Sequence, residues 1–109
     1  MAVRTKLLAE GATPNVFTTI YTCPAGETAI LKNIHCFNPA GGATELVEIQ
    51  FNASGTNRVL ERASMPVQTI FAFDTWIVIP AGATMRIRST PNGGVNYWFS
   101  GTELEGVAD

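Results

Sequence analysis

A five-residue turn phrase occurs twice in this chain of 109 residues. Pro-Ala-Gly-Glu-Thr occupies residues 24–28, and Pro-Ala-Gly-Ala-Thr occupies residues 80–84. Proline fixes the backbone φ angle and glycine accepts the positive φ of a tight reversal, so each copy is typical of a turn between strands. Apolar runs lie on both sides of each copy. The repeat therefore predicts an all-β domain built from two similar hairpin units.

Alternating apolar and polar residues predict further strands. Residues 45–51, 84–89 and 95–104 each place apolar side chains on one face, as expected for strands with one buried face: Val47, Ile49 and Phe51, then Met85 and Ile87, then Val95, Tyr97 and Phe99. Pro-Asn-Gly-Gly at residues 91–94 predicts a hairpin. Turn signals recur about every 8–12 residues, and helical periodicity is not sustained. We expect an all-β fold, an antiparallel, jelly-roll-like β-sandwich of about 8–9 strands.

Two expectations concern the apolar region at residues 67–79, and both depend on a turn at Asp74. Asp74 separates residues 67–73 from residues 75–79, and we interpret it as a corner between two strands. Trp76 lies within the second apolar run, which predicts that it is part of the core.

The length fits one domain. We expect an N-terminal strand or arm over residues 1–14, the sandwich over residues 15–105 and a short tail over residues 106–109. The arm either packs on its own domain or adds to the edge of a neighbouring copy. The N-terminus has no continuous apolar segment typical of a secretory signal, and no run is long enough to span a membrane, so we expect folding in a cytosol.

Charged residues make up 15% of the chain, against about 25% in an average soluble protein. Either part of the surface is covered in an assembly, or the domain simply has a neutral surface. The net charge of −2 predicts no general attraction to nucleic acid or to an anionic membrane. Basic residues near the start and acidic residues near the end would pair either within one domain or between copies.

The sequence contains no recognisable catalytic set. His35 is the single histidine, and its neighbour Cys36 would point to the opposite face of a strand. Cys23 and Cys36 would lie about 25 Å apart along paired strands, so we expect two buried thiols and no disulfide. We expect no enzyme activity, no metal site and no cofactor.

Candidate contact residues come from charge and strand alternation. Arg86 and Arg88 share one face of a strand, and either form a small basic patch or pair with Glu45, Glu48 and Glu61. Trp98 has the opposite parity to Tyr97 and Phe99, so it faces a second packing layer or a partner. The candidate interface consists of Arg4, Lys6, Leu8, Trp98, Arg86 and Arg88.

A second candidate site would bind carbohydrate for host attachment. Trp98 and Tyr97 would stack on sugar rings, flanked by the loops at residues 39–43 and 91–94. This hypothesis competes with the protein interface for Trp98.

The order of the turn phrases resembles that of a known group of proteins. Tyr-Thr-Cys-Pro-Ala-Gly-Glu-Thr at residues 21–28 leads into a strand ending at Asn38, Pro-Ala-Gly recurs at residues 80–82, and Ser-Gly-Thr-Glu closes the pattern at residues 100–103. Over residues 17–104 the chain resembles the small β-sandwich virion proteins of tailed bacteriophages, which serve as head decoration, neck or tail accessory proteins.

The resemblance implies a non-enzymatic structural component of a tailed-phage virion, made in the host bacterial cytoplasm. A head decoration (cement) protein is the leading expectation, and a neck, tail or fibre-associated β-sandwich is the alternative. Its partners would be the major capsid protein or neck and tail proteins, together with further copies of itself, with no nucleic acid and no membrane. No catalytic or ligand residues define the group, so none is carried over.

Overall fold

The computed structural model describes residues 3–39 and 43–105, without the side chains of residues 3 and 4. Eight strands and no helix occur in these residues. The strands are β1 (Val3–Ala12), β2 (Thr18–Thr22), β3 (Glu27–Phe37), β4 (Glu45–Asn52), β5 (Arg58–Met65), β6 (Ile70–Ile79), β7 (Thr84–Thr90) and β8 (Asn96–Glu105). The prediction of an all-β antiparallel sandwich is confirmed. The expected tail at residues 106–109 and part of the loop at residues 39–43 lie outside the described residues.

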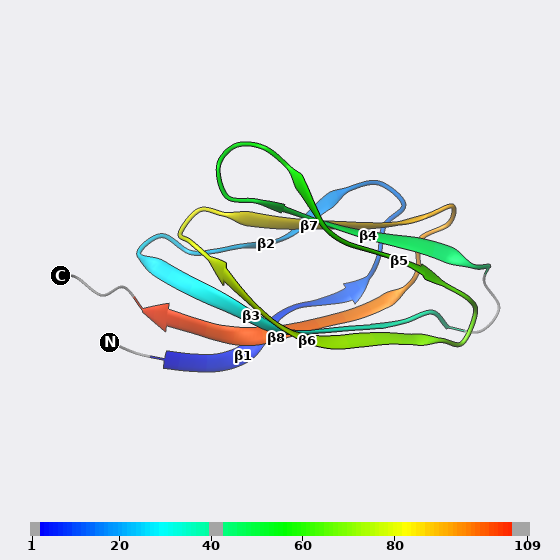
Figure 1. The fold of residues 1–109 in the computed structure, drawn as a ribbon, viewed down its shortest axis with the longest axis horizontal. Helices are drawn as coiled ribbons and strands as arrows, with labels where there is room; N and C mark the ends of the chain where they lie inside the picture. Colours follow the sequence, from blue (N-terminus) through cyan, green and yellow to red (C-terminus); the bar gives the residue numbers. More distant parts are fainter. Residues whose placement is uncertain (1–2, 40–42, 106–109) are drawn as a thin grey trace.

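The strands form two four-stranded antiparallel sheets. Sheet A has the order β1-β8-β3-β6, and sheet B has the order β2-β7-β4-β5. Figure 1 shows sheet B as the upper layer and sheet A as the lower one. Early strands pair with late ones, β1 with β8, β2 with β7, β3 with β6 and β4 with β5. This nesting describes a long antiparallel ribbon folded into two layers, which is a jelly-roll-like sandwich.

The repeated turn phrase forms two corners between the sheets. In both copies the N–H of the fourth residue donates to the proline carbonyl (3.2 and 3.0 Å), and the glycine has a φ of 77° or 82°. The strands on either side of each turn belong to different sheets. The prediction of two hairpin units is therefore wrong, although both turns are present.

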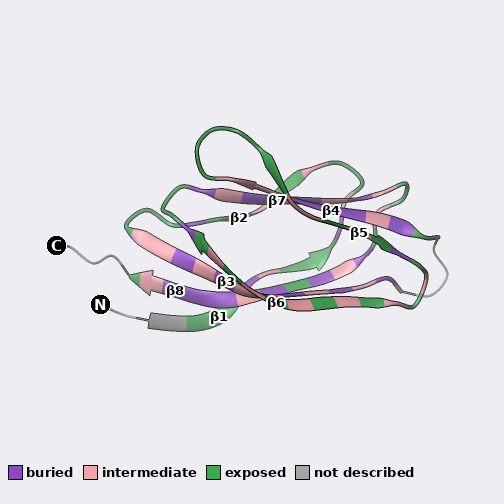
Figure 2. Cartoon of the chain, in the orientation of Figure 1, coloured by how far each residue is buried: buried purple, intermediate pink, exposed green. Residues whose placement is uncertain are grey.

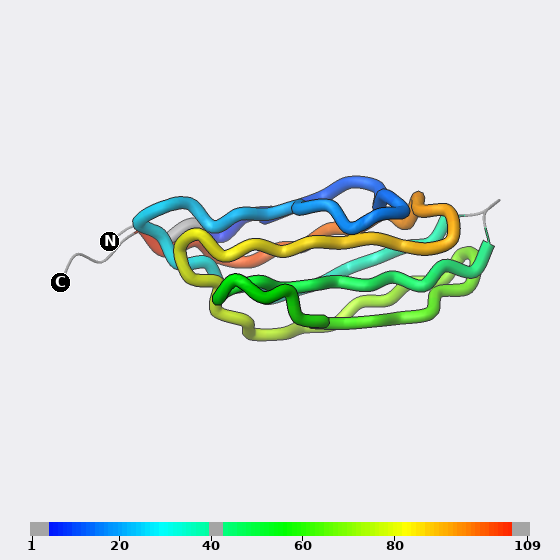
Figure 3. The backbone as a smooth tube through the Cα atoms, turned by 90° about the horizontal axis from the view of Figure 1, so that it is seen from above, coloured from blue at the N-terminus to red at the C-terminus, as the bar shows by residue number. Residues whose placement is uncertain are grey.

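The two corners are hydrogen-bonded to each other. Cys23 N–H donates to the Ala83 carbonyl (2.9 Å), and Gly82 N–H donates to the Cys23 carbonyl (3.0 Å). Figure 3 shows both turns at the same end of the sandwich. The two strands of the ribbon thus change sheet at the same point, and each uses the same turn to do so.

The hairpin predicted at residues 91–94 is also a crossing, because β7 and β8 lie in different sheets. A buried carboxylate holds this turn. Glu45, which is 1% exposed, accepts the N–H groups of Asn92 (3.1 and 3.2 Å) and Gly93 (2.8 Å). Among the described strands, only β4 and β5 are joined consecutively within one sheet.

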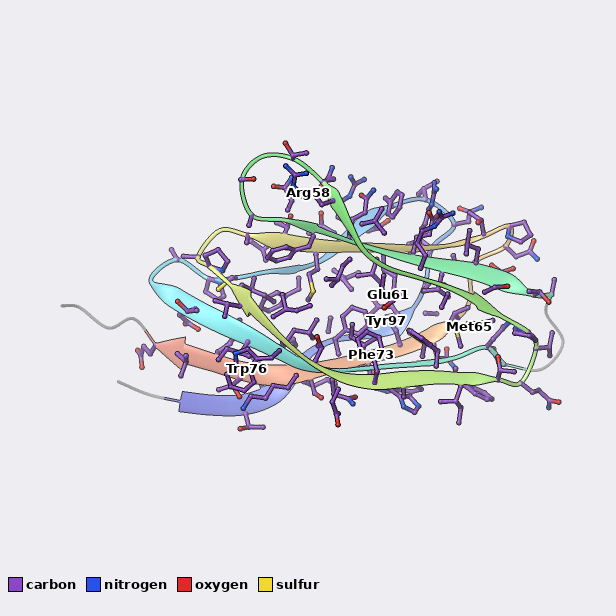
Figure 4. The ribbon with its side chains drawn as sticks, in the orientation of Figure 1. Arg58, Glu61, Met65, Phe73, Trp76 and Tyr97 are labelled. Atoms are coloured by element: carbon purple, nitrogen blue, oxygen red, sulfur yellow. The ribbon has the colours of Figure 1, made fainter. Side chains whose placement is uncertain are left out.

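The core lies between the sheets and follows the predicted alternation. Figure 2 shows buried positions alternating along the central strands. The largest fully buried side chains include Phe99 and Leu31 of sheet A and Ile49, Met85 and Ile87 of sheet B. Figure 4 places Met65, Phe73 and Tyr97 between the layers.

The apolar region around Asp74 forms one continuous strand. β6 runs through Asp74 without a corner, so the prediction of two strands is wrong. Asp74 lies opposite Asn33 of β3, whose Nδ2 donates to its carboxylate (3.0 Å). The partner of Asp74 therefore comes from the neighbouring strand β3, and Asp74 is not part of a turn.

Candidate interaction surface

The outer face of sheet A carries most of the large apolar side chains exposed in the described chain. Of seven such side chains, only Val16 and Val59 lie elsewhere. Strand alternation explains the arrangement: along β6 each exposed residue alternates with one that turns toward the core. The remaining five side chains form what we call the apolar face: Leu7, Ile70, Trp76, Val78 and Trp98.

Trp98 lies on the apolar face, because its neighbours Tyr97 and Phe99 are buried on the other side of β8. It is 38% exposed. Its ring centroid lies 5.3 Å from that of His35 in an edge-to-face arrangement. Sheet B packs on the opposite side of sheet A, so within the described chain no second layer covers this indole.

Trp76 is a residue that the sequence pattern misplaced. It is 65% exposed on β6, where a core position was predicted. The Lys32 Nζ atom lies 5.2 Å from the centroid of the Trp76 ring, within the range of a cation–π contact. Its even parity, opposite to that of Phe71 and Phe73, was the available signal for an outward position.

The outer face of sheet B is charged and internally paired. Arg88 binds the Glu48 carboxylate at 2.8 Å, and Arg62 binds the same carboxylate at 3.1 Å. The guanidinium carbons of Arg88 and Arg86 lie 4.2 and 5.3 Å from the centroid of the Phe17 ring. We call Phe17, Glu48, Arg62, Arg86 and Arg88 the charged face.

The charged face therefore has its own counter-ion, Glu48, and an aromatic support, Phe17. The expected pairing of Arg88 with acidic residues is observed at Glu48, whereas Glu45 instead binds the turn at residues 91–94. Arg86 donates to the Phe17 carbonyl (3.3 Å) and to Gln50 (3.5 Å). These contacts use up much of the donor capacity that a bound anion would need.

The N-terminal candidates lie in β1, which pairs with β8 of its own domain. Lys6 Nζ lies 3.2 Å from Glu103 Oε1, so at least one pair of oppositely charged ends forms within the chain. Leu8 is buried in the core and is therefore not available to a partner, although it was a candidate interface residue; a register shift lies beside it, between Leu7 and Ala9. The side chain of Arg4 lies outside the described part.

Glu103 connects this end of β1 to sheet B. The Tyr21 hydroxyl donates to Glu103 Oε2 at 2.6 Å. Burial, followed by the hydrogen bond and the charge of Glu103, raises the pKa of Tyr21 well above its ordinary value. The buried carboxylate thus has partners from both sheets and acts as a bridge between them.

The proposed sugar-binding pair does not assemble. Tyr97 is buried in the core while Trp98 is on the outer face, so their rings cannot form one platform. His35 and Cys36 also lie on opposite sides of β3, as predicted. Cys23 and Cys36 are free and buried, and burial raises the pKa of Cys36 to about 12.

In the part of the chain that the structure describes, no three His, Cys, Asp or Glu side chains are grouped so that they would hold a metal ion. The same residues contain no helix with the length and apolar character needed to cross a membrane.

No protein-family model and no curated protein sequence matches this chain. Solved structures with a similar fold do exist. A chain from the disulfide-linked pili of Bacillus endospore appendages has a TM-score of 0.60 at 13% identity, covering 97% of this chain and 90% of that one. A chain from the infectious bursal disease virus particle has a TM-score of 0.54 at 11% identity and covers 98% of this chain.

This chain spans 36% of that viral chain, which is therefore much longer. A pentameric capsid protein from metagenomic phage sequences has 21% identity, with a TM-score of 0.43 over 89% of this chain. The pilus and bursal disease virus chains show a shared β-sandwich fold.

Proposed function

We propose that this chain is a non-enzymatic structural subunit of a tailed-phage virion and that it binds other virion proteins through sheet A. The apolar face carries the proposal, since it places Trp76, Val78 and Ile70 in solvent along one strand of a domain with few charges. Exposed apolar patches of this kind mark protein contacts. The turn phrases shared with small phage virion proteins support the same assignment.

Within the virion, a head decoration (cement) protein is the role we favour. A four-stranded sheet face with exposed apolar side chains suits contact with a broad protein lattice, and the paired charges of sheet B suit the side exposed to water. The major capsid protein would be the partner, with neck or tail proteins as the alternative. The occurrence of the same fold in a virus particle and in a pilus is consistent with an assembly role.

Immunogold labelling of intact virions with an antibody to this chain tests the proposal. Gold distributed over the head supports decoration, and gold confined to the neck or tail replaces that role with the accessory one. Absence of the chain from purified particles, shown by mass spectrometry, would overturn the virion assignment.

A second candidate is host attachment through a glycan, because two exposed indoles, Trp76 and Trp98, lie on the same sheet face. Exposed indoles stack on sugar rings as well as on protein. Tryptophan fluorescence titration with host polysaccharide should respond in the wild type and lose its response in Trp98→Ala. Absence of a response at saturating polysaccharide would eliminate this candidate.

A further inference from the structure

Strand β6 is an unusually unprotected sheet edge. It is ten residues long, pairs with β3 on one side, and has no strand partner on the other side among the described residues. Asp74 is its single charged residue. A long apolar edge of this kind offers unpaired N–H and C=O groups to any further strand.

The other three edges carry the features that prevent such pairing. β2 is five residues long. β5 contains Arg58, Glu61 and Arg62, and β1 contains charged residues and a register shift. Short length, charge and irregular pairing all discourage the addition of a strand. The contrast identifies β6 as the edge at which another chain would add.

Two opposite charges stand beside this edge without an ion-pair partner in the described chain. Lys32 Nζ lies over the Trp76 ring, and the Asp74 carboxylate accepts one hydrogen bond from Asn33. Both belong to the outer side of sheet A, where an added strand would place its own side chains next to them. A matching strand should therefore bring an acid near Lys32 and a base near Asp74.

We propose that a second copy of this chain supplies that strand, with the two β6 strands pairing antiparallel about a two-fold axis at Thr75. In this register Asp74 of one copy faces Trp76 of the other, beside the Lys32 amine that lies over that ring. The symmetry repeats the contact, giving two Lys32–Asp74 pairs. Ala72 faces Val78, so a small side chain meets a larger one.

Charge selects this register. An axis at Asp74 would place the two carboxylates directly opposite each other, and like charges in that position destabilise a strand pair. An axis at Thr75 avoids this repulsion and places each Asp74 carboxylate near the Lys32 amine of the other copy. It joins the two four-stranded sheets into one continuous eight-stranded sheet.

The contact is small. Pairing along residues 72–78 supplies about six to eight main-chain hydrogen bonds, and the buried area falls below the roughly 1,200 Å² of a standard interface. We therefore expect a micromolar dimer that an assembled particle would reinforce. This inference rests on the proposed assembly role, but each can fail without the other, because dimerisation is measured on the purified chain and the virion role on particles.

Sedimentation equilibrium of the full chain over micromolar to millimolar concentrations tests the pairing. The wild type should dimerise, while Asp74→Lys and Lys32→Asp should each raise the dimer Kd at least about tenfold. An equimolar mixture of these two variants should dimerise like the wild type. One variant carries two positive charges at these positions and the other two negative ones, so a mixed dimer has opposite charges across both pairs.

Val78→Lys provides a second measurement with a matched control. Val78 is 52% exposed on β6, and Val59 is 58% exposed on β5. Val78→Lys should raise the dimer Kd about tenfold or more, and Val59→Lys should leave it unchanged. Circular dichroism melts would show that both variants fold.

Three results would overturn the pairing: a wild-type chain that stays monomeric at millimolar concentration, open-ended oligomers, or a mixture no better than the single variants. Open-ended growth would indicate head-to-tail contact between different edges. A monomer that nevertheless labels virions would remove the dimer and leave the virion role standing.

Discussion

The outer faces of the two sheets differ in how far the chain satisfies them by itself. On sheet B, Glu48 is shared by Arg62 and Arg88, and Phe17 lies against two guanidinium groups. On sheet A, the indole of Trp76 and the side chain of Val78 project into solvent. Both sheets have four strands and bury the same core. They differ in their outer faces, because side chains pair with one another on sheet B and large apolar side chains stay exposed on sheet A.

This difference separates side chains that stabilise the folded domain from side chains that are available to bind a partner. A paired exterior contributes to the stability of the isolated domain, whereas an exposed apolar exterior contributes little until something covers it. Substitutions should therefore separate the two faces by their effect on the free energy of unfolding.

The largest loss of stability should come from inside sheet A. A Cβ atom added at Gly101 would overlap the Ile30 carbonyl oxygen and lie 3.2 Å from the Leu31 Cα atom. Gly101→Ala should therefore lower the free energy of unfolding by about 3 kcal/mol, because backbone must shift to accept the methyl group. Urea denaturation measures the loss, with Ser100→Ala as the neighbouring control. Wild-type stability in Gly101→Ala would mean that β8 and β3 are not so closely paired.

The second largest loss should come from the buried carboxylate of sheet B. Glu45→Ala removes the acceptor for the N–H groups of Asn92 and Gly93. Leaving these groups unpaired should cost about 2 kcal/mol by urea denaturation. Glu61→Ala is the matched control, since its carboxylate accepts a hydrogen bond from the exposed N–H of Arg62. Equal losses in the two variants would contradict a special role for Glu45.

Much of the sandwich could be predicted from local patterns, because strand alternation reports directly on one buried face. That rule placed Val47 and Ile49, and also Tyr97 and Phe99, toward the core. It does not determine which strand ends a sheet. At an edge with an uncovered outer face, both parities are apolar, and for this reason Trp76 resembled a core residue.

Contacts between distant segments could not be predicted for a related reason. The two proline-containing phrases predicted that the backbone turns at these positions. They did not predict the hydrogen bond between Cys23 and Ala83 that joins the two corners. The turn at residues 91–94 likewise gave no indication that Glu45 would hold it, because Glu45 and Gly93 lie 48 positions apart in the sequence. These contacts arise from the folding of the whole ribbon.

A smaller loss should follow from disrupting the charged face. Glu48→Ala leaves Arg62 and Arg88 close together without their shared counter-ion. Because both arginines are partly exposed, solvent weakens the effect, and we expect a loss of about 1 kcal/mol. A double-mutant cycle with Arg88→Ala isolates the coupling between the two side chains. A coupling of zero would show that the charged face does not stabilise the fold.

The smallest effect on folding should come from the largest exposed side chain. Trp76→Ala removes an indole from solvent on the apolar face and gives up a contact with Lys32, so the free energy of unfolding should change by less than about 0.5 kcal/mol. Phe17→Ala on the charged face is the matched aromatic control and should cost about 1 kcal/mol, since its ring supports two arginines. If Trp76→Ala proved the more damaging of the two in urea denaturation, the apolar face would belong to the fold of the monomer, and its exposure would no longer indicate a partner. If Phe17→Ala is the more damaging variant, folding does not require Trp76, and binding to a partner explains why a tryptophan occupies this exposed position.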